Sequence, residues 1–248
     1  EHRLHPEMMA SWQPAPPEYW RAWTDECALA DGIVVNSEWS SRLLIEAGIE
    51  SKKLHVIPVA YEGAIEGRAL VREYPEQFTA SRPLRILFLG AFVLRKGAAA
   101  VLDAIHLLQK EPVEFWIVGA TGVNVPAALR DSPKVKWIGP VPREATSTYY
   151  RTADLFLFPT VSDGFGMTQV EARGWKLPII TTPNCAPIIK HNINGLVISK
   201  SDGSLLADSI RALLRDPSEL VRLSIGAASE YEDYSLARVR ERYLALNL

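Results

Sequence analysis

Between residues 83 and 200, short apolar runs alternate with segments of helical character, and this alternation constrains the fold more than any other feature. The runs are rich in Val, Ile, Leu and Phe and mostly continuous, which is typical of parallel strands buried on both faces. The sequence therefore predicts an α/β fold with a doubly wound, parallel, Rossmann-like sheet and flanking helices. The expected strands are Leu84–Leu89, Glu114–Val118, Val135–Ile138, Leu155–Phe158, Ile179–Thr182 and Leu196–Ile198.

Composition narrows the class of protein. The chain has 248 residues, of which 48% are hydrophobic and 23% charged, as in an ordinary globular protein. A net charge of -2 gives no general attraction to nucleic acid, so no nucleic-acid partner is expected. No apolar run approaches the roughly 18 residues that a membrane-spanning helix needs, and peripheral membrane attachment stays open. Cys27 and Cys185 have no metal or redox spacing, which favours a reducing cytoplasm.

No pattern of metal ligands is present in the sequence. His55, His106 and His191 share no spacing with acidic residues or cysteines, and Asp-x-Asp does not occur. Chemistry on a metal-bound diphosphate is therefore not expected, and no metal site is predicted.

Glycines follow three of the expected strands at their carboxyl ends. Gly90, Gly119 and Gly139 each stand where the chain turns sharply or approaches a ligand closely. Taken singly, each glycine is explained by a tight turn between strand and helix. Taken together, the three favour a nucleotide cleft at this edge of the sheet.

The segment from Ser162 to Ala172 carries the strongest local signal. Asp163 and Glu171 stand eight positions apart around a Gly-Phe-Gly turn, with a buried strand before it and a helix to about Trp175 after it. A helix start after a glycine-rich turn presents free N–H groups and the positive end of the helix dipole, which suit a phosphate. Asp163 has an alternative role as a turn or cap residue, and Glu171 as an exposed helical side chain. The turn and the helix start comprise Gly164, Phe165, Gly166, Met167 and Thr168.

Arg95 and Lys96 follow the first strand of the array, ahead of a helix expected to begin near Gly97. Two cations at a helix start oppose the dipole, and a bound diphosphate would remove that conflict. The alternative is a solvated pair of side chains. The segment is not a P-loop, because neither the glycine spacing nor a Ser or Thr after the lysine is present.

Four segments in one order carry a family resemblance: Gly90–Gly97, Asp163–Glu171, Gly174–Ile180 and Asn194–Val197. The set resembles the retaining GT-B glycosyltransferases of group 1 (family 4), over roughly residues 20 to 230. This sequence departs from the usual pattern in three places. Asp163 replaces the common Glu, Ala91 stands where an Arg is frequent, and Ala186-Pro187-Ile188 stands where a Glu is common.

The resemblance implies roles for these residues. Lys96 would contact the donor phosphates, Glu171 the ribose diol and Asp163 the transferred sugar, which makes these three the expected catalytic set. The donor would be a UDP-, GDP- or ADP-sugar, with no further cofactor and no metal. The expected donor-binding residues are Gly90, Arg95, Lys96, Gly139, Gly164, Phe165, Gly166, Met167, Thr168 and Glu171.

The resemblance also divides the chain. Residues 1–62 are expected to be the last βαβ unit of an amino-terminal Rossmann-like domain, and 63–82 a linker. Residues 83–230 are expected to form the nucleotide-sugar-binding domain, and 231–248 a terminal helix that crosses back. With no initiator Met and no signal peptide, the chain reads as a fragment. The missing part, or a partner chain, would hold the acceptor site.

The leading hypothesis is a metal-independent, retaining glycosyltransferase that acts in polysaccharide biosynthesis or on a lipid or other hydroxyl acceptor. This chain alone would bind the donor and turn over poorly. One alternative is a non-catalytic sugar-nucleotide-binding module that works beside a partner chain. Another is a GT-B relative of different chemistry, such as an epimerase or a phosphorylase, for which no supporting motif is present.

Overall fold

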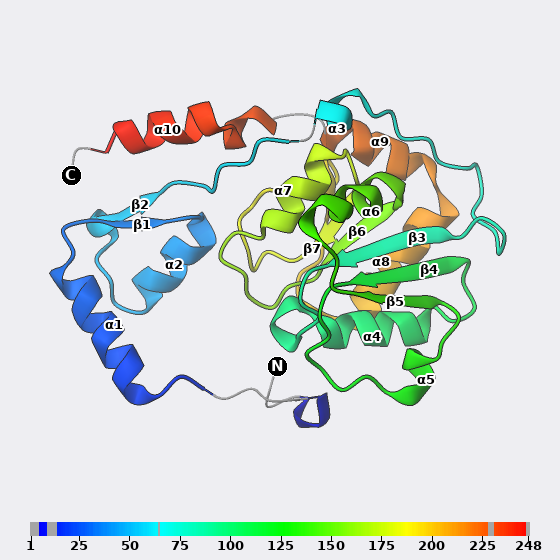
Figure 1. Ribbon diagram of the computed structural model, residues 1–248, viewed down its shortest axis with the longest axis horizontal. Coiled ribbons are helices and arrows are strands. Elements are labelled where there is room, and N and C mark those ends of the chain that lie inside the picture. Colours follow the sequence, from blue (N-terminus) through cyan, green and yellow to red (C-terminus); the bar gives the residue numbers. More distant parts are fainter. Residues whose placement is uncertain (1–4, 9–13, 64, 228–230, 247–248) are drawn as a thin grey trace.

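The computed structural model describes residues 5–8, 14–63, 65–227 and 231–246. Its larger body contains one sheet of six strands in the order β5-β4-β3-β6-β7-β8, and every neighbouring pair is parallel (Figure 1). This arrangement confirms the predicted doubly wound α/β class. The strands are β3 (Leu84–Leu89), β4 (Val113–Val118), β5 (Val135–Gly139), β6 (Leu155–Phe158), β7 (Ile179–Thr181) and β8 (Gly195–Val197).

Helices cover both faces of this sheet because successive strand residues point to opposite sides. On β3, Ile86 and Phe88 enter one core while Leu87 enters the other, and all three are buried. The first core lies under α4 (Ala98–Leu107), α5 (Ala127–Arg130), α8 (Gly203–Arg215) and α9 (Ser218–Ala227). The second lies under α6 (Thr146–Thr152) and α7 (Met167–Gly174).

The order of the strands creates a crevice. Along the chain, β4 pairs with one side of β3, and β5 pairs with the far side of β4. The next strand, β6, pairs with the other side of β3. The connections after β3 and β6 therefore leave toward opposite faces, and ligands of such sheets bind between them at the carboxyl ends. This switch point is where the predicted cations and the Gly-Phe-Gly turn meet.

A smaller unit precedes the sheet. It contains α1 (Pro17–Leu29), β1 (Ile33–Val35), α2 (Glu38–Glu46) and β2 (Leu54–Val56), with β1 and β2 parallel. Helix α2 begins at Glu38 because the Ser37 side chain accepts the backbone N–H of Ser40 and caps the helix. Strand β2 ends at Val56, shortly before Pro58, which has no N–H to continue the ladder.

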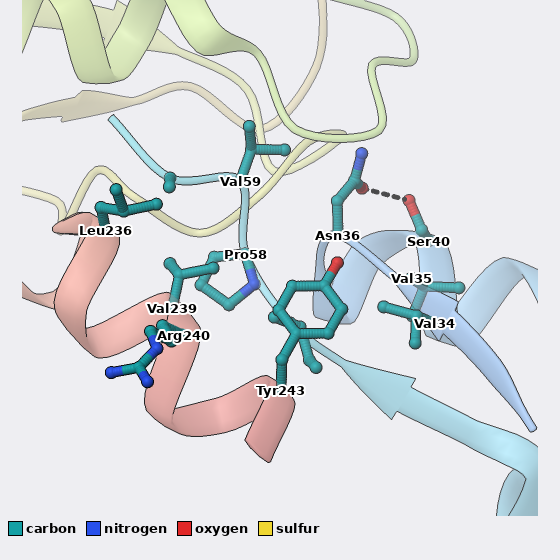
Figure 2. A pocket seen from close by; sticks show the side chains of 12 residues that line it. Val34, Val35, Asn36, Ser40, Pro58, Val59, Leu236, Val239, Arg240 and Tyr243 are labelled. Atoms are coloured by element: carbon teal, nitrogen blue, oxygen red, sulfur yellow. Dashed lines mark hydrogen bonds between the residues drawn. The ribbon is translucent and has the colours of Figure 1, made fainter. Parts of the chain in front are cut away.

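Two described segments that link the units, the one after β2 and the one before α10, lie side by side (Figure 1). The backbone N–H of Tyr61 donates to the Tyr234 carbonyl at 2.8 Å, and the N–H of Leu236 donates to Glu62 Oε1 at 2.8 Å. Helix α10 (Leu236–Leu244), capped by Ser235, then runs along the smaller unit (Figure 1). An apolar groove of about 800 Å³ separates α10 from β1 and from the segment after β2 (Figure 2).

Residues 63–82, which were expected to be an irregular linker, contain the short helix α3 (Ile65–Ala69) and pack on the larger body. The Arg72 guanidinium donates to the carbonyls of Tyr150, Ala153 and Trp175, at the carboxyl ends of α6 and α7. A cation is favourable there because helix dipoles are negative at that end. The 3-10 turns are Pro6–Met8, Ser51–Lys53, Leu94–Lys96, Arg143–Ala145 and Tyr231–Tyr234.

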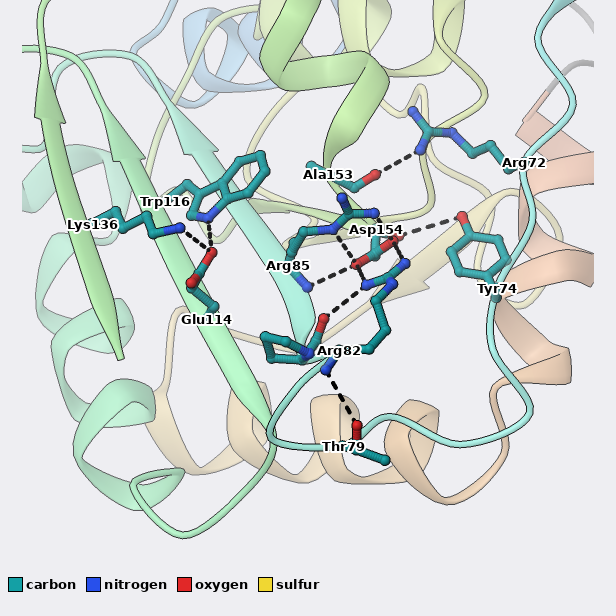
Figure 3. Close-up of polar contacts among 11 residues, drawn as sticks. Arg72, Tyr74, Thr79, Arg82, Arg85, Glu114, Trp116, Lys136, Ala153 and Asp154 are labelled. Atoms are coloured by element: carbon teal, nitrogen blue, oxygen red, sulfur yellow. Dashed lines mark hydrogen bonds and ion pairs between the residues drawn. The ribbon is translucent and has the colours of Figure 1, made fainter. Parts of the chain in front are cut away.

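At the edge of the sheet opposite the crevice, a buried carboxylate joins β3 to β6. Asp154 accepts two hydrogen bonds from Arg82, at 2.7 and 2.8 Å, and two from the Arg85 guanidinium, both at 3.0 Å (Figure 3). The backbone N–H of Arg85 adds a fifth, at 2.9 Å. Burial alone would raise the pKa of Asp154, but the hydrogen bonds from the two arginines bring that pKa below its ordinary value.

Candidate functional site

The glycines at the carboxyl ends of the strands allow close backbone approach. Gly90, Gly119 and Gly139 have φ values of +133°, +135° and +77°, which side chains rarely adopt. A Cβ on Gly119 would lie 2.0 Å from the Gly90 carbonyl oxygen, so the loops after β3 and β4 pack directly on each other. At Gly139 the same position meets nothing within 4 Å, which leaves open space at the end of β5.

Lys96 lies against the end of β3. A Cβ built on Gly90 would stand 3.3 Å from the Lys96 Nζ, so the ammonium occupies the space that glycine leaves free. Arg95 and Lys96 belong to the 3-10 turn Leu94–Lys96, and α4 starts only at Ala98. The cations thus precede the helix, rather than occupying its first turn. Gly97 makes this possible, because a Cβ there would meet the Pro159 carbonyl oxygen at 2.1 Å.

The cations meet Asp163 across the crevice. Arg95 Nη1 donates to the Ser162 carbonyl at 2.8 Å and lies 3.5 Å from Asp163 Oδ2. Lys96 Nζ lies 3.9 Å from the same oxygen. The Asp163 and Lys96 side chains are 17% and 20% exposed, whereas Arg95 is 53% exposed and has room to turn toward a ligand. Two positive charges face one negative charge, so this part of the crevice carries a net positive charge.

The helix start after the Gly-Phe-Gly turn has free hydrogen-bonding capacity. Gly166, at φ +78°, is the N-cap of α7, and no side chain caps this end. The Thr168 Oγ1 is buried and has no hydrogen-bond partner in the described part of the chain. Unsatisfied groups of this kind at a helix start fit a phosphate, whose oxygens accept hydrogen bonds from N–H and O–H donors.

Gly164, Phe165 and Met167, the other residues at the turn, determine its conformation and its packing. Phe165 is buried, and its ring meets that of Tyr234 edge-on at 5.9 Å, so only the backbone of Phe165 faces the turn. A Cβ on Gly164 would lie 3.2 Å from Asn36 Oδ1, which shows how closely the smaller unit approaches. Met167, the first residue of α7, is half-buried.

Glu171 lies in the second turn of α7 and is half-buried. The hydroxyl of Tyr150, which is 1% exposed on α6, donates to Glu171 Oε2 at 2.7 Å. Burial, together with the charge of Glu171, raises the pKa of Tyr150 well above its ordinary value, so the hydroxyl stays a donor at neutral pH. The sequence did not predict this role for Tyr150. Tyr149 and Tyr150 are adjacent on α6, and their sequence does not indicate which of the two rings faces Glu171 on α7.

The smaller unit also reaches the turn. The Ser37 hydroxyl donates to the Gly164 carbonyl, and the Ser40 hydroxyl lies 3.5 Å from the same oxygen. Ser37 is buried and is also the cap of α2, so polar contacts at the Gly164 carbonyl join the two units at the site. The sequence signal for these contacts is weak, since a Ser after a short strand is usual at any helix start.

The described residues offer neither a metal site nor a membrane-spanning helix. No group of three or more His, Cys, Asp or Glu side chains could hold a metal ion among them. Within the same ranges, every helix is too short or too polar to cross a bilayer.

The strand order, with cations and a helix start without a side-chain cap at the switch point, defines an α/β domain of the Rossmann-like class. The sequence profile of the family described as glycosyl transferases group 1 matches residues 83–216, more than half of the chain. The chain belongs to this family, which confirms the resemblance seen in its motifs.

Two curated relatives illustrate the similarity. A D-inositol 3-phosphate glycosyltransferase from Nocardia farcinica is 28% identical over 88% of this chain and 52% of its own length. The amylovoran biosynthesis glycosyltransferase AmsK from Erwinia amylovora is 24% identical over 86% of this chain and 54% of its own. The chain thus spans about half the length of the curated relatives that it matches.

Solved structures share the fold. Anabaena HepE in complex with UDP superposes with a TM-score of 0.73 at 16% identity, over 96% of this chain and 69% of HepE. Sucrose-phosphate synthase from Thermosynechococcus elongatus gives a TM-score of 0.69 at 19% identity, over 94% of this chain and 65% of the synthase. The architecture is therefore that of the GT-B glycosyltransferases.

Proposed function

We propose that this chain supplies the donor-binding half of a retaining glycosyltransferase, which moves a sugar from a nucleoside-diphosphate donor to an acceptor hydroxyl. The observation that carries the proposal is that Lys96 and Arg95 lie beside Asp163, just before the turn that leads into α7, and that the Thr168 Oγ1 at the start of this helix is buried with no hydrogen-bond partner among the described residues. A diphosphate would satisfy both the cations and the orphaned donors. HepE has been solved with UDP and with UDP-glucose, which makes UDP the first nucleotide to test.

In the proposed reaction, the bond between the anomeric carbon and the diphosphate oxygen breaks, and negative charge grows on the diphosphate. Lys96, Arg95 and the N–H groups of Gly166 to Thr168 stabilise that charge in a fixed arrangement, and no metal is required. The acceptor oxygen bonds to the anomeric carbon on the face that the diphosphate leaves, and its proton passes to the departing phosphate. Asp163 contacts the transferred sugar, and Glu171 accepts hydrogen bonds from the ribose diol.

The proposal assigns residues 83–230 to donor binding and residues 1–62 to the last βαβ unit of an acceptor-binding domain. Residues 63–82 connect the two, and residues 231–248 cross back. The parallel pair β1 and β2 supports this division, because two strands do not make a stable Rossmann-like domain alone. The acceptor is a carbohydrate, lipid or other hydroxyl compound, held largely by a domain or partner chain beyond these residues, and the reaction is cytoplasmic.

Thermal unfolding with UDP, GDP, ADP and their sugar conjugates tests donor binding. A ligand at about 100 times its dissociation constant adds roughly 2.7 kcal/mol to the free energy of unfolding, which raises the melting temperature clearly. We expect a rise with one nucleotide and its loss in Lys96→Ala. Lys110→Ala, an exposed lysine near the opposite edge of the sheet, is the matched control and should keep the rise. No rise with any nucleotide in the wild type would contradict the proposal.

A second measurement separates an enzyme from a binding module. Release of free nucleoside diphosphate from the donor sugar should be slow with this chain alone, because the acceptor half is incomplete. Supplying the rest of the chain, or a partner, should raise it. Donor binding with no transfer in the complete protein would favour the non-catalytic module instead.

A further inference from the structure

The Glu171 carboxylate is held by a buried partner on a different helix. Tyr150 Oη donates to Glu171 Oε2 at 2.7 Å, and the structure gives Oε1 no hydrogen bond within the described residues. One carboxylate oxygen is thus fixed by the protein, while the other remains available. A Glu side chain has three rotatable bonds, so without such a partner its carboxylate would occupy several positions over the cleft.

Tyr150 itself has little freedom. Its ring is 1% exposed and lies 5.8 Å from the ring of Phe156 on β6, centroid to centroid. Its backbone carbonyl accepts a hydrogen bond from Arg72, which also bonds the Ala153 and Trp175 carbonyls. Arg72 therefore ties together the carboxyl ends of α6 and α7, the two helices that bear Tyr150 and Glu171.

We infer that Tyr150 is the positioning residue for ribose recognition, because it fixes the Glu171 carboxylate in the orientation that accepts the two hydroxyls of the nucleotide. The inference rests on the proposed function. It adds a residue that the family motifs of this sequence do not include, and it gives Arg72 of the connecting segment an indirect part. Tyr150 touches neither ribose nor phosphate; it acts through Glu171.

A purely structural explanation competes with this one. A buried tyrosine hydroxyl needs some hydrogen-bond partner, and on this explanation Glu171 is no more than that partner. The two explanations differ in one measurable respect. Loss of a structural bond weakens the binding of every nucleotide alike, whereas loss of a positioning bond weakens only ligands that carry the ribose hydroxyls.

The experiment compares UDP with 2′,3′-dideoxy-UDP on the wild type and on Tyr150→Phe, by calorimetric titration. Tyr150→Phe should weaken UDP binding about tenfold, the size expected for a hydrogen bond to a charged group, and leave the dideoxy ligand unchanged. Tyr149→Phe removes the same hydroxyl one position away, next to Trp116 rather than Glu171, and should leave the affinity for both ligands unchanged. Equal weakening of both ligands by Tyr150→Phe would overturn the inference.

If Tyr150→Phe also lowers stability, a double-mutant cycle with Glu171→Gln still separates the positioning role of Tyr150 from a general loss of structure. In a Glu171→Gln background, adding Tyr150→Phe should change UDP affinity by less than about twofold, since the residue that Tyr150 positions has already been altered. A further large loss in that background would overturn the inference. Failure of the wild type to bind any nucleoside diphosphate would instead contradict the proposed function, so the two failures are distinguishable.

Discussion

Asp163 and Lys96 face each other across the ends of β6 and β3, with the Asp163 Oδ2 3.9 Å from the Lys96 Nζ. At that separation the pair is held by charge rather than by a hydrogen bond, and Arg95 approaches the same oxygen at 3.5 Å. A partly exposed pair of this kind contributes little to stability. Asp163 therefore holds Lys96 and Arg95 near the turn before α7, while neither cation forms a close ion pair with it.

Replacing Asp163 by Asn should strengthen the binding of nucleoside diphosphate. The substitution removes a carboxylate that repels the phosphates and competes for both cations, and we expect an affinity gain of about threefold. Calorimetric titration at fixed ionic strength measures it. Asp208→Asn, which removes an exposed partner of Arg211 on α8, is the control and should have no effect. Weaker binding in Asp163→Asn would mean that Asp163 orients the cations instead.

Gly97→Ala should destabilise the fold by about 3 kcal/mol, because it adds a backbone clash to an unfavourable φ. The new Cβ would meet the Pro159 carbonyl oxygen at 2.1 Å, and φ at Gly97 is +84°. Gly48 has a similar φ, +94°, with nothing within 4 Å of the added atom. Gly48→Ala should therefore cost only about 1 kcal/mol. Urea unfolding measures both, and equal losses would refute the role given to the clash.

Asp154→Asn should lower the free energy of unfolding by about 3 kcal/mol at pH 7, since it leaves two arginines without their carboxylate. Chemical denaturation of wild type and variant gives the difference. Asp131→Asn, an exposed position after α5, serves as the control. A loss below 1 kcal/mol would mean that water replaces Asp154 at little cost.

The same carboxylate predicts a pH dependence. Because hydrogen bonds from Arg82 and Arg85 hold the pKa of Asp154 below its ordinary value of 3.8, folding favours the ionised form. Its contribution is complete above the pKa of the unfolded chain and is lost as the pH falls toward the lower pKa of the folded state. The difference in stability between wild type and Asp154→Asn should therefore shrink below about pH 4. A constant difference down to pH 2.5 would contradict this assignment.

Cys185 should resist alkylation in the folded protein. Burial raises the pKa of its thiol to about 11, despite hydrogen bonds from Thr181 and Gln169 that act in the opposite direction. At pH 8 we expect no labelling by iodoacetamide until the chain unfolds, as read from the mass of the Cys185 peptide. Labelling of the native protein at the rate of a free thiol would show that the region next to Asp163 opens.

The fold of the larger body could be predicted because its signals are local. The β3 run Leu84–Leu89 is apolar apart from Arg85, and this run, the glycines behind the strands and the Ser235 cap each act through their own neighbours in sequence. The six-stranded parallel sheet follows from repeating that local pattern. In this body the strand ends differ from the expected ones by one residue at most.

The contacts between distant elements could not be predicted. Nothing near Tyr150 in the sequence specifies Glu171 as its partner, and Arg72 in a polar segment gives no sign that it spans the ends of two helices. Ser37 likewise meets Gly164 only because α10 and the segment after β2 fix the smaller unit against the larger one. These contacts depend on tertiary geometry, which periodicity and spacing do not encode.

The two side-by-side segments between the units are joined by the hydrogen bond from the Tyr61 N–H to the Tyr234 carbonyl. They therefore connect the units as a pair, rather than as one independent linker. A single tether permits twisting and sliding as well as bending. The two paired segments, with Glu62 holding the start of α10, fix the smaller unit to the larger one along two stretches of the chain. Met8, whose carbonyl accepts the Asn124 N–H, holds residues 5–8 on the larger body as well. The Ser37 hydroxyl and the Gly164 carbonyl are thereby held within hydrogen-bonding reach of each other, so the position of the Gly-Phe-Gly turn is coupled to that of the smaller unit.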